Sequence, residues 1–301
     1  MLARLLWLAL GLLTAAALGA AWWAGSRWGW AGWAIAAGAA GLFLAFHAVT
    51  VLATFAVSSR YRAPPPAGFR IGPLAAIRCL LHEMLCHTGA YVLLQPFPGF
   101  ALPREPRGAA GSRPALILVH GYACNAAVWA WLARRLAARF EVFTVTLEPV
   151  FAHIEEYVAP LARKVDEVAG RGGRVALVAH SMGGLVCRAY LRRHGGGKVA
   201  RLVTLGAPHH GSALAPIGYG GDAEDMRPMA EWLRALAAAG ETVPTTSIYT
   251  WHDNYVVPQT SSVLAGAKNV PLAGIGHLSL LFSRRVAALV EAELARPNEP
   301  A

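Results

Sequence analysis

The most informative segment of this chain is Val178-Ala179-His180-Ser181-Met182-Gly183-Gly184-Leu185. Residues 174–178 form a short, largely apolar run typical of a buried strand, and residues 185–193 have helical composition. A serine between small residues, on a sharp turn from strand to helix, is the pattern of a nucleophile elbow. A strained turn with positive φ at the serine brings the backbone close, so side chains larger than methyl at Ala179 or Gly183 would clash. We therefore predict that Ser181 is a nucleophile whose hydroxyl stands clear of a sheet.

Strand-like and helix-like segments alternate along the rest of this region. Strands are predicted at about 115–119, 141–147, 174–179, 199–205, 245–250 and 269–273, and helices at about 124–139, 154–169, 182–194 and 278–294. Alternation of this kind predicts an α/β fold with a doubly wound, mainly parallel sheet. Residues 212–241 break the alternation and are too long for an ordinary connection. We expect either a lid or cap insertion there, or a packed surface helix with no gating role.

A serine nucleophile needs a histidine base, and the histidine needs a carboxylate that fixes its tautomer. Asp253 follows the predicted strand at 245–250, and His277 lies between glycines after the strand at 269–273. Both stand where open α/β sheets place their sites. Asp222, Glu224 and Asp225 are competing acids, but they lie in the polar insertion. The flanking histidines, His180, His209, His210 and His252, are more simply explained as turn, capping or supporting residues.

The predicted strand at 115–119 ends in His120-Gly121-Tyr122, where glycine lets the backbone turn sharply and expose an amide. We assign the backbone N–H groups of Tyr122 and Met182 as a pair of oxyanion donors. We expect further substrate contacts from nearby residues, namely His120, Gly121, His209, Met226 and Trp232.

From about residue 114 to 294 the sequence resembles the α/β-hydrolase superfamily, specifically bacterial triacylglycerol lipases and esterases. The resemblance rests on five elements in the family's order: Val119-His120-Gly121-Tyr122, Ala179-His180-Ser181-Met182-Gly183-Gly184, Thr204-Leu205-Gly206-Ala207-Pro208-His209-His210-Gly211, Asp253-Asn254-Tyr255-Val256-Val257-Pro258 and Gly276-His277. Most members carry glycine where this chain has Ala179, but small secreted lipases that nearly lack a lid share the alanine. The resemblance implies a Ser181/Asp253/His277 triad that needs no metal and no cofactor.

The N-terminal third has a different composition. Residues 2–24 and 28–57 are almost entirely apolar, and each is long enough to cross a hydrocarbon core of ~30 Å. We predict a hairpin of two membrane spans within residues 1–60, with its tip at Gly25-Ser26-Arg27 and tryptophans clustered around the tip. A cleaved signal peptide is the alternative for the first span. The arginines after the second span place both ends of the hairpin in the cytoplasm under the positive-inside rule.

Residues 61–113 are predicted to be a proline-rich juxtamembrane linker with one helix at 73–94, followed by the catalytic domain at 114–301. Residues 1–113 hold nine arginines, no lysine and two glutamates, so the basic charge lies beside the spans and suits anionic headgroups. No nucleic-acid recognition motif accompanies it, and we reject that class of partner. His82-Glu83 and His87 suggest zinc, but the histidines lie five residues apart rather than the four of a zinc helix. Four cysteines without paired spacing predict no disulfide framework.

Together these features predict a serine hydrolase of carboxylic esters, anchored in the bacterial inner membrane and acting on lipid acyl esters. The catalytic domain is expected in the cytoplasm, with the periplasm as the alternative, because similar enzymes are often exported. An acyltransferase or thioesterase with the same triad is the second reading, and a catalytically silent membrane-bound module is the third.

Overall fold

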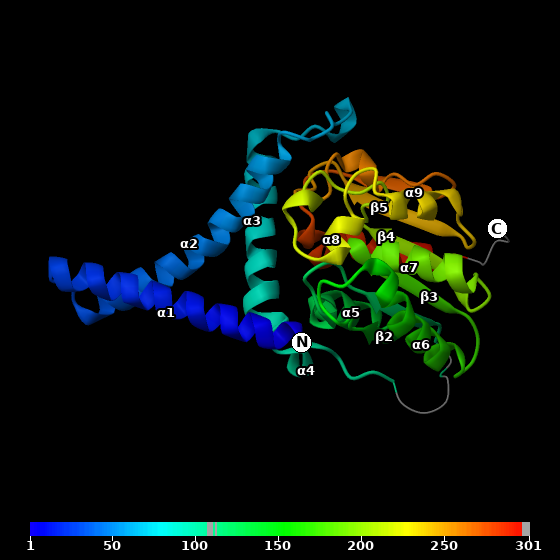
Figure 1. The fold of residues 1–301 in the computed structure, drawn as a ribbon, viewed down its shortest axis with the longest axis horizontal. Helices are drawn as coiled ribbons and strands as arrows, with labels where there is room; N and C mark the ends of the chain where they lie inside the picture. Colours follow the sequence, from blue (N-terminus) through cyan, green and yellow to red (C-terminus); the bar gives the residue numbers. More distant parts are fainter. Residues whose placement is uncertain (107–110, 112, 297–301) are drawn as a thin grey trace.

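The computed structural model describes residues 1–106, 111 and 113–296, and its centre is one six-stranded sheet (Figure 1). All strand pairs are parallel and the order is β2-β1-β3-β4-β5-β6. The strands are β1 (Ala115–Val119), β2 (Glu141–Val145), β3 (Val175–His180), β4 (Val199–Leu205), β5 (Thr245–Thr250) and β6 (Lys268–Leu272). The chain leaves β1 in one direction and returns on its other side at β3. This reversal creates a crevice at the carboxyl ends of β1 and β3, where α/β sheets bind their ligands.

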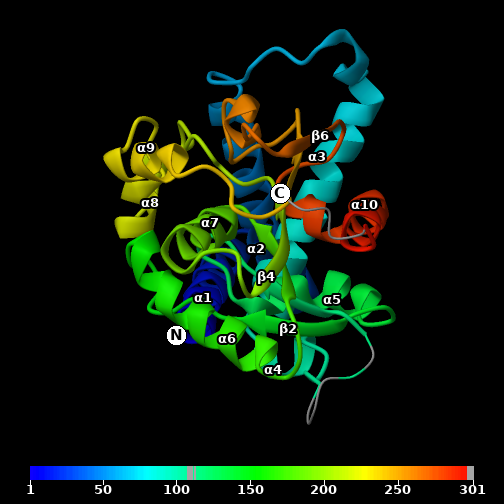
Figure 2. The ribbon, with the colours of Figure 1, turned by 90° about the vertical axis from the view of Figure 1, so that its right-hand side faces the viewer.

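Helices cover both faces of the sheet, because successive strand residues point to opposite sides. Ile117 and Val119 pack with α6 (Val158–Ala169) and α7 (Met182–His194) on one face. The alternate residues Leu116 and Leu118 pack with helices α5 (Ala130–Leu136) and α10 (Arg284–Leu294) on the other. Figure 2 shows the two helical layers on either side of the strands. The predicted doubly wound α/β fold is confirmed.

The element boundaries follow the sequence closely, with differences at helix starts. Three of the predicted helices begin as tight 3-10 turns, namely η3 (Ala126–Trp129), η4 (Ile154–Tyr157) and η7 (Leu278–Phe282). The helix predicted at 278–294 is divided, because the Ser283 side chain accepts the Val286 N–H at 3.3 Å and starts α10 as a new helix. β2 also ends at Val145, two residues earlier than predicted.

The insertion at 212–241 contributes to a cavity wall and also contains a packed surface helix, and its role as a lid stays a prediction. It contains η5 (Ala215–Ile217), α8 (Gly221–Asp225) and α9 (Glu231–Ala238). The part up to Met226 borders the cavity described below. α9 instead packs Leu233 and Leu236 into the core under α7, as an ordinary surface helix does.

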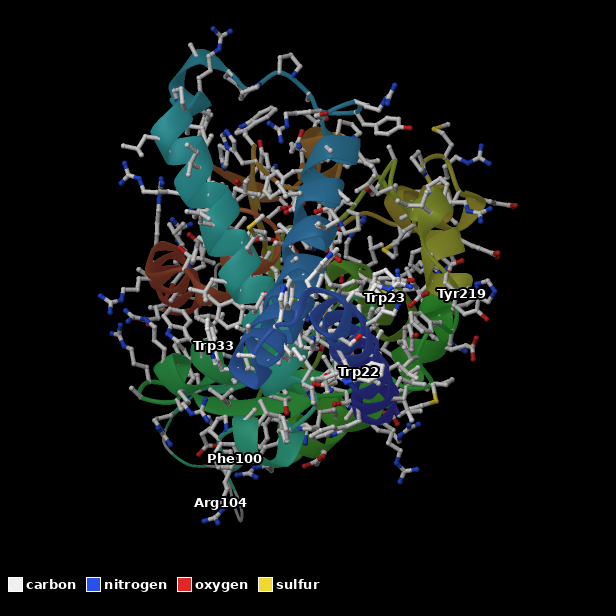
Figure 3. All side chains as sticks on the ribbon, turned by 90° about the vertical axis from the view of Figure 1, so that its left-hand side faces the viewer. Trp22, Trp23, Trp33, Phe100, Arg104 and Tyr219 are labelled. Carbon is white, nitrogen blue, oxygen red and sulfur yellow. The ribbon has the colours of Figure 1, made fainter. Side chains whose placement is uncertain are left out.

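Two long apolar helices, α1 (Leu2–Trp28) and α2 (Gly32–Ser58), pack as a hairpin that projects from the α/β body (Figure 1). Both are long and apolar enough to cross a membrane, by length and composition. The turn lies at Gly29, whose φ of 66° ends α1, rather than at the predicted Gly25–Arg27. Gly25 instead permits close helix packing, because a Cβ there would lie 2.5 Å from the Ile35 side chain. Figure 3 shows Trp22, Trp23 and Trp33 on this hairpin.

The linker contains a long helix, α3 (Pro73–Thr88), which stands between the hairpin and the α/β body (Figure 1). It continues into the π-helical turn η2 (Gly89–Leu94), and α4 (Pro98–Ala101) follows. The two sides of α3 differ. Its buried residues, Cys79, Glu83, Cys86 and His87, face the protein, whereas Leu74, Ile77, Leu81 and Leu85 are exposed. The end of the linker, at 107–110 and 112, and the last residues of the predicted catalytic domain, 297–301, lie outside the described residues.

Candidate active site

Ser181 stands at the turn from β3 into α7 with φ 53° and ψ −129°, a conformation strained for any residue but glycine. Two glycines allow the neighbouring backbone to come this close. A Cβ on Gly183 would lie 2.5 Å from the carbonyl oxygen of His120, and a Cβ on Gly121 would lie 2.8 Å from Cβ of Ser181. The strained geometry is that of a nucleophile elbow, with the backbone N–H of Met182 at the first position of α7.

His277 and Asp253 meet across the loops that follow β6 and β5. Nδ1 of His277 donates to Oδ2 of Asp253 at 2.8 Å, and both side chains are buried. The other carboxylate oxygen, Oδ1, accepts the N–H groups of Tyr255 at 2.8 Å and Val256 at 2.7 Å. Both oxygens of Asp253 are therefore engaged, and Nε2 is the imidazole nitrogen left for a proton transfer.

Burial alone would lower the pKa of His277, but the neighbouring carboxylates outweigh this effect. The charge of Asp253, its hydrogen bond and the charge of Glu83 together raise the pKa above the ordinary 6.5 of a histidine. His180 lies against the same ring, at 4.6 Å between ring centroids, and its Nε2 donates to the His277 carbonyl oxygen at 3.2 Å. Burial holds the pKa of His180 well below the usual range, so a neutral ring supports His277 from behind.

His120 fixes the turn after β1, because both of its ring nitrogens form hydrogen bonds within the protein. Its Nε2 accepts the Leu147 N–H at 2.9 Å, and its Nδ1 donates to the Gly121 carbonyl oxygen at 2.9 Å. Burial lowers the pKa of His120 to about 4, so the ring stays neutral. The Tyr122 hydroxyl donates to the Tyr219 carbonyl oxygen and accepts the Tyr219 N–H, each at 2.9 Å, which ties this turn to the insertion.

A cavity of about 400 Å³ joins these parts, and its wall includes Ser181 and His277. The volume is within the range of small-molecule binding pockets. Much of the remaining wall is apolar and comes from the insertion and the loop after Asp253, including Leu214, Ile217, Ala223, Met226 and Val256.

Of the side chains predicted to contact substrate, Met226 lines this cavity. The polar atoms of His120, His209 and Trp232 form hydrogen bonds within the protein instead. His120 and Gly121 lie behind the turn. His209 shares a hydrogen bond with Oγ1 of Thr204 at 3.2 Å, and Nε1 of Trp232 donates to Glu155 at 3.3 Å. Burial holds the pKa of His209 well below the usual range. These two bonds are structural, and none of His120, His209 and Trp232 borders the cavity.

Sequence reasoning missed the part of the cavity wall that comes from the N-terminal segment. Thr54 of α2, His87 of α3 and Tyr91 of η2 all line the cavity. Oγ1 of Thr54 also accepts from Nδ2 of Asn254 at 2.8 Å, and Oδ1 of Asn254 accepts the His277 N–H at 3.1 Å. No local pattern marks these residues, because they meet the site through contacts outside their own helices, as Thr54 does with Asn254 and Tyr91 with Ala123.

Glu83 is the second missed residue, and it did carry a signal. It is the sole acidic residue before position 105, and it stands in the helical segment of a strongly basic N-terminal region. In the structure its carboxylate is completely buried beside the His277 loop.

The four cysteines are all buried and free. Within the described part of the chain, no three histidine, cysteine or acidic side chains are arranged to hold a metal ion. The His82-Glu83 and His87 pattern is explained by packing, since Glu83 bonds to the backbone and His87 lies between His47 and Tyr91.

Comparisons with known proteins match this geometry. The mature lipase BlEst2 of Bacillus licheniformis superposes with a TM-score of 0.55 at 18% identity, covering 64% of this chain and 95% of that one. Lipase B of Aspergillus fumigatus superposes with a TM-score of 0.58 at 19% identity, covering 65% of this chain and 57% of that one. At this identity the likeness concerns the fold.

Two curated relatives are both named pimeloyl-[acyl-carrier protein] methyl ester esterase. The protein from Sodalis glossinidius is 39% identical over 94 residues, which are 30% of this chain and 35% of the relative. The protein from Vibrio atlanticus is 28% identical over 176 residues, 52% of this chain and 67% of the relative. A family model described as the alpha/beta hydrolase family matches residues 116–294. Since that match covers more than half of the sequence and the sheet, elbow and loops agree with it, the chain belongs to the alpha/beta hydrolase family.

Proposed function

We propose that this protein is a serine hydrolase that cleaves carboxylic esters of lipids, held at the membrane by α1 and α2. The observation that carries the proposal is the shared cavity wall: Ser181 and His277 line one apolar cavity together with Thr54 of the long apolar helix α2. A cavity bounded by such a helix is suited to a substrate that reaches it from a bilayer.

The geometry supports acyl transfer to water in two steps. In the first, Nε2 of His277 takes the proton of Ser181, and Oγ attacks the ester carbonyl carbon. The negative oxygen that forms is held by the backbone N–H groups of Tyr122 and Met182, each such donor being worth on the order of 3 kcal/mol. The ester C–O bond then breaks, and the leaving alkoxide takes the proton from the imidazolium.

In the second step water replaces the alcohol. His277 takes a proton from the water, hydroxide attacks the acyl carbon, and Ser181 leaves with the proton returned by the imidazolium. Asp253 orients the ring and stabilises its positive charge through the 2.8 Å bond. Residues of the insertion such as Ile217 and Met226 would accept the acyl chain. No metal or cofactor takes part in these steps.

Two contacts hold the start of α1 against the linker and the α/β body. Nε1 of Trp7 donates to the Pro96 carbonyl oxygen at 3.1 Å, and the terminal amine of Met1 bonds to Glu148. Helix α3, with one apolar face exposed, is suited to lie in the plane of the membrane between the hairpin and the body. The arginines after α2 favour a body in the cytoplasm under the positive-inside rule, with the periplasm as the alternative.

The test uses the full chain in detergent micelles and p-nitrophenyl esters from acetate to palmitate. We expect turnover that is lost in Ser181→Ala, with an optimum at medium or long acyl groups. Labelling by a fluorophosphonate probe in the wild type but not in Ser181→Ala would report the nucleophile independently of acyl preference. Turnover that survives in folded Ser181→Ala, or the absence of both turnover and labelling, would overturn the proposal.

Assays on the same preparation distinguish ester hydrolysis from two related activities. Acyl transfer to an added alcohol or lysolipid in preference to water would identify an acyltransferase, and preference for acyl thioesters would identify a thioesterase. The names of the two curated relatives, both ester hydrolases, support the hydrolysis of an oxygen ester.

A further inference from the structure

Glu83 of α3 is a buried carboxylate whose hydrogen bonds all go to the loop that carries His277. Its Oε1 accepts the Leu278 N–H and its Oε2 accepts the Ser279 N–H, both at 2.8 Å. These are the first two residues after His277. On the other side of His277, a Cβ on Gly276 would lie 2.4 Å from Oε2, so the glycine is needed for the carboxylate to approach.

Leaving a carboxylate in this position is costly for the folded protein. The side chain is completely buried, and among the described residues no lysine or arginine lies within ion-pair distance of it. Burial raises the pKa of Glu83, and the two backbone N–H groups and the charge of His277 oppose the rise. A hydrogen-bonded neutral side chain could fix the same loop without desolvating a charge. The presence of an acid therefore points to a use for its charge.

We propose that Glu83 is a positioning residue for the hydrolase reaction, which holds His277 in place through Leu278 and Ser279 and adds a second negative charge that stabilises the imidazolium. The inference rests on the proposed function. In it, Asp253 fixes the imidazole ring from Nδ1 while Glu83 fixes the backbone next to the same residue. The two carboxylates reach His277 from different parts of the chain.

Glu83 lies outside the part of the chain that forms the hydrolase fold. Glu83 lies in the linker, before the region at 116–294 that the family model covers. Helix α3 presents Glu83 to the active site and Leu81 and Leu85 to the outside. The position of a helix beside the two apolar spans thus sets the position of the base, and the catalytic machinery extends beyond the hydrolase fold into the linker.

The test compares Glu83→Gln and Glu83→Asp with the wild type as full chains in micelles, measuring kcat and KM for one p-nitrophenyl ester across pH. The groups that face His277 are Asp253 after β5, Glu83 on α3, and His180 and Tyr255, so the acidic limb of kcat/KM reports their combined effect on the base. Glu83→Gln removes charge and one acceptor. We expect kcat to fall by about 10²-fold with little change in KM, because misplaced catalytic groups cost about that much. We also expect the acidic limb to move to lower pH.

Glu83→Asp keeps the charge but withdraws it by one methylene, so kcat should fall while the acidic limb stays near its wild-type position. Cys86→Ala is the matched control, since Cys86 is buried one helical turn further along α3 and has no part in the site. It should change neither kcat nor the limb. Should Glu83→Gln fail to fold, the Glu83→Asp profile decides alone.

Wild-type kcat in either folded Glu83 variant would overturn the inference. So would an acidic limb that stays unmoved in Glu83→Gln while its melting temperature falls, because that is the result of a purely structural cap. Ser181→Ala, measured alongside, distinguishes failure of the proposed function from failure of the role of Glu83. Loss of turnover in Ser181→Ala with an unaffected Glu83→Gln rejects the role of Glu83 alone, whereas turnover in Ser181→Ala rejects the proposed function and the role together.

Discussion

Replacing Asp253 by asparagine should stop turnover while leaving the fold intact. The amide has the size of the carboxylate, and its oxygen can still accept the N–H groups of Tyr255 and Val256. The amide nitrogen then faces Nδ1 of His277, where Oδ2 now stands at 2.8 Å. A donor in that position forces Nδ1 to become the acceptor. The imidazole proton moves to Nε2, and the ring can no longer take the proton of Ser181.

The expected loss of kcat in Asp253→Asn follows from the change of tautomer. An imidazole held in the wrong tautomer lowers kcat by about 10⁴-fold in a serine hydrolase of this type, which is equivalent to ~5.5 kcal/mol of transition-state stabilisation. The loss should be in kcat rather than KM, since Asp253 does not line the cavity. The melting temperature should change little, because one buried polar group replaces another of equal size.

The assay is steady-state hydrolysis of a p-nitrophenyl ester at about pH 8, together with thermal melting of both proteins. Asp222→Asn is the matched control, since Asp222 is equally buried but lies in the insertion and bonds to Ala223 and Tyr157 instead. It should keep kcat within about twofold, as expected of an independent site. Near-normal turnover in folded Asp253→Asn, or a large loss in Asp222→Asn instead, would refute the assignment of the acid.

Three more outcomes are expected. Gly183→Ala places a Cβ 2.5 Å from the His120 carbonyl oxygen and 2.6 Å from that of Val119, so it should lower the free energy of unfolding by about 1–3 kcal/mol. Gly197→Ala, with nothing within 4 Å, should leave the melting temperature unchanged, and equal melting of the two variants would contradict the close-approach argument. Burial raises the pKa of Asp222 to about 7, so between about pH 4 and pH 7 the folded protein keeps a proton that the unfolded chain has released. Stability should therefore fall by a few kcal/mol as the pH rises through that interval, and melting of Asp222→Asn should lose this slope; parallel pH curves for both proteins would reject it. Leu214→Trp narrows the cavity and should shift the optimum of the ester series to shorter acyl groups, each lost methylene contact being worth about 1–3 kcal/mol; an unchanged optimum would place the acyl chain elsewhere.

The sequence specifies the sheet and the order of its elements because those depend on local patterns. β1, β4 and β5 have the predicted bounds, and α7 begins and ends where the elbow pattern places it. Asp253 and His277 were found because each follows a strand, and strands in a parallel sheet deliver their carboxyl ends to one edge. Their hydrogen bond then follows from topology rather than from any further detail of the sequence.

Contacts between distant segments could not be predicted in this way. His120 and Trp232 were expected to touch substrate because they lie near the right turns, but Leu147 and Glu155 engage their polar atoms instead. The sequence predicts the hairpin turn at Gly25-Ser26-Arg27, although helix packing rather than chain reversal requires Gly25. In each case a partner remote in sequence decides the role of the residue, and no periodicity reports it.

The same remoteness argues against treating the N-terminal segment as a detachable anchor. Two separate paths reach the His277 loop from it. Glu83 on α3 accepts the Leu278 and Ser279 N–H groups, and Thr54 on α2 accepts from Asn254, which in turn accepts the His277 N–H. A third path runs from the Ala63 N–H to Gln259, whose amide donates to the carbonyl oxygen of Asp253 at 2.9 Å. An anchor needs none of these bonds, because a tether works at any length. Since these paths end on the acid, on the base or on the two residues that follow the base, moving the helices would move the catalytic groups, and activity is expected to depend on the environment in which α1, α2 and α3 are held.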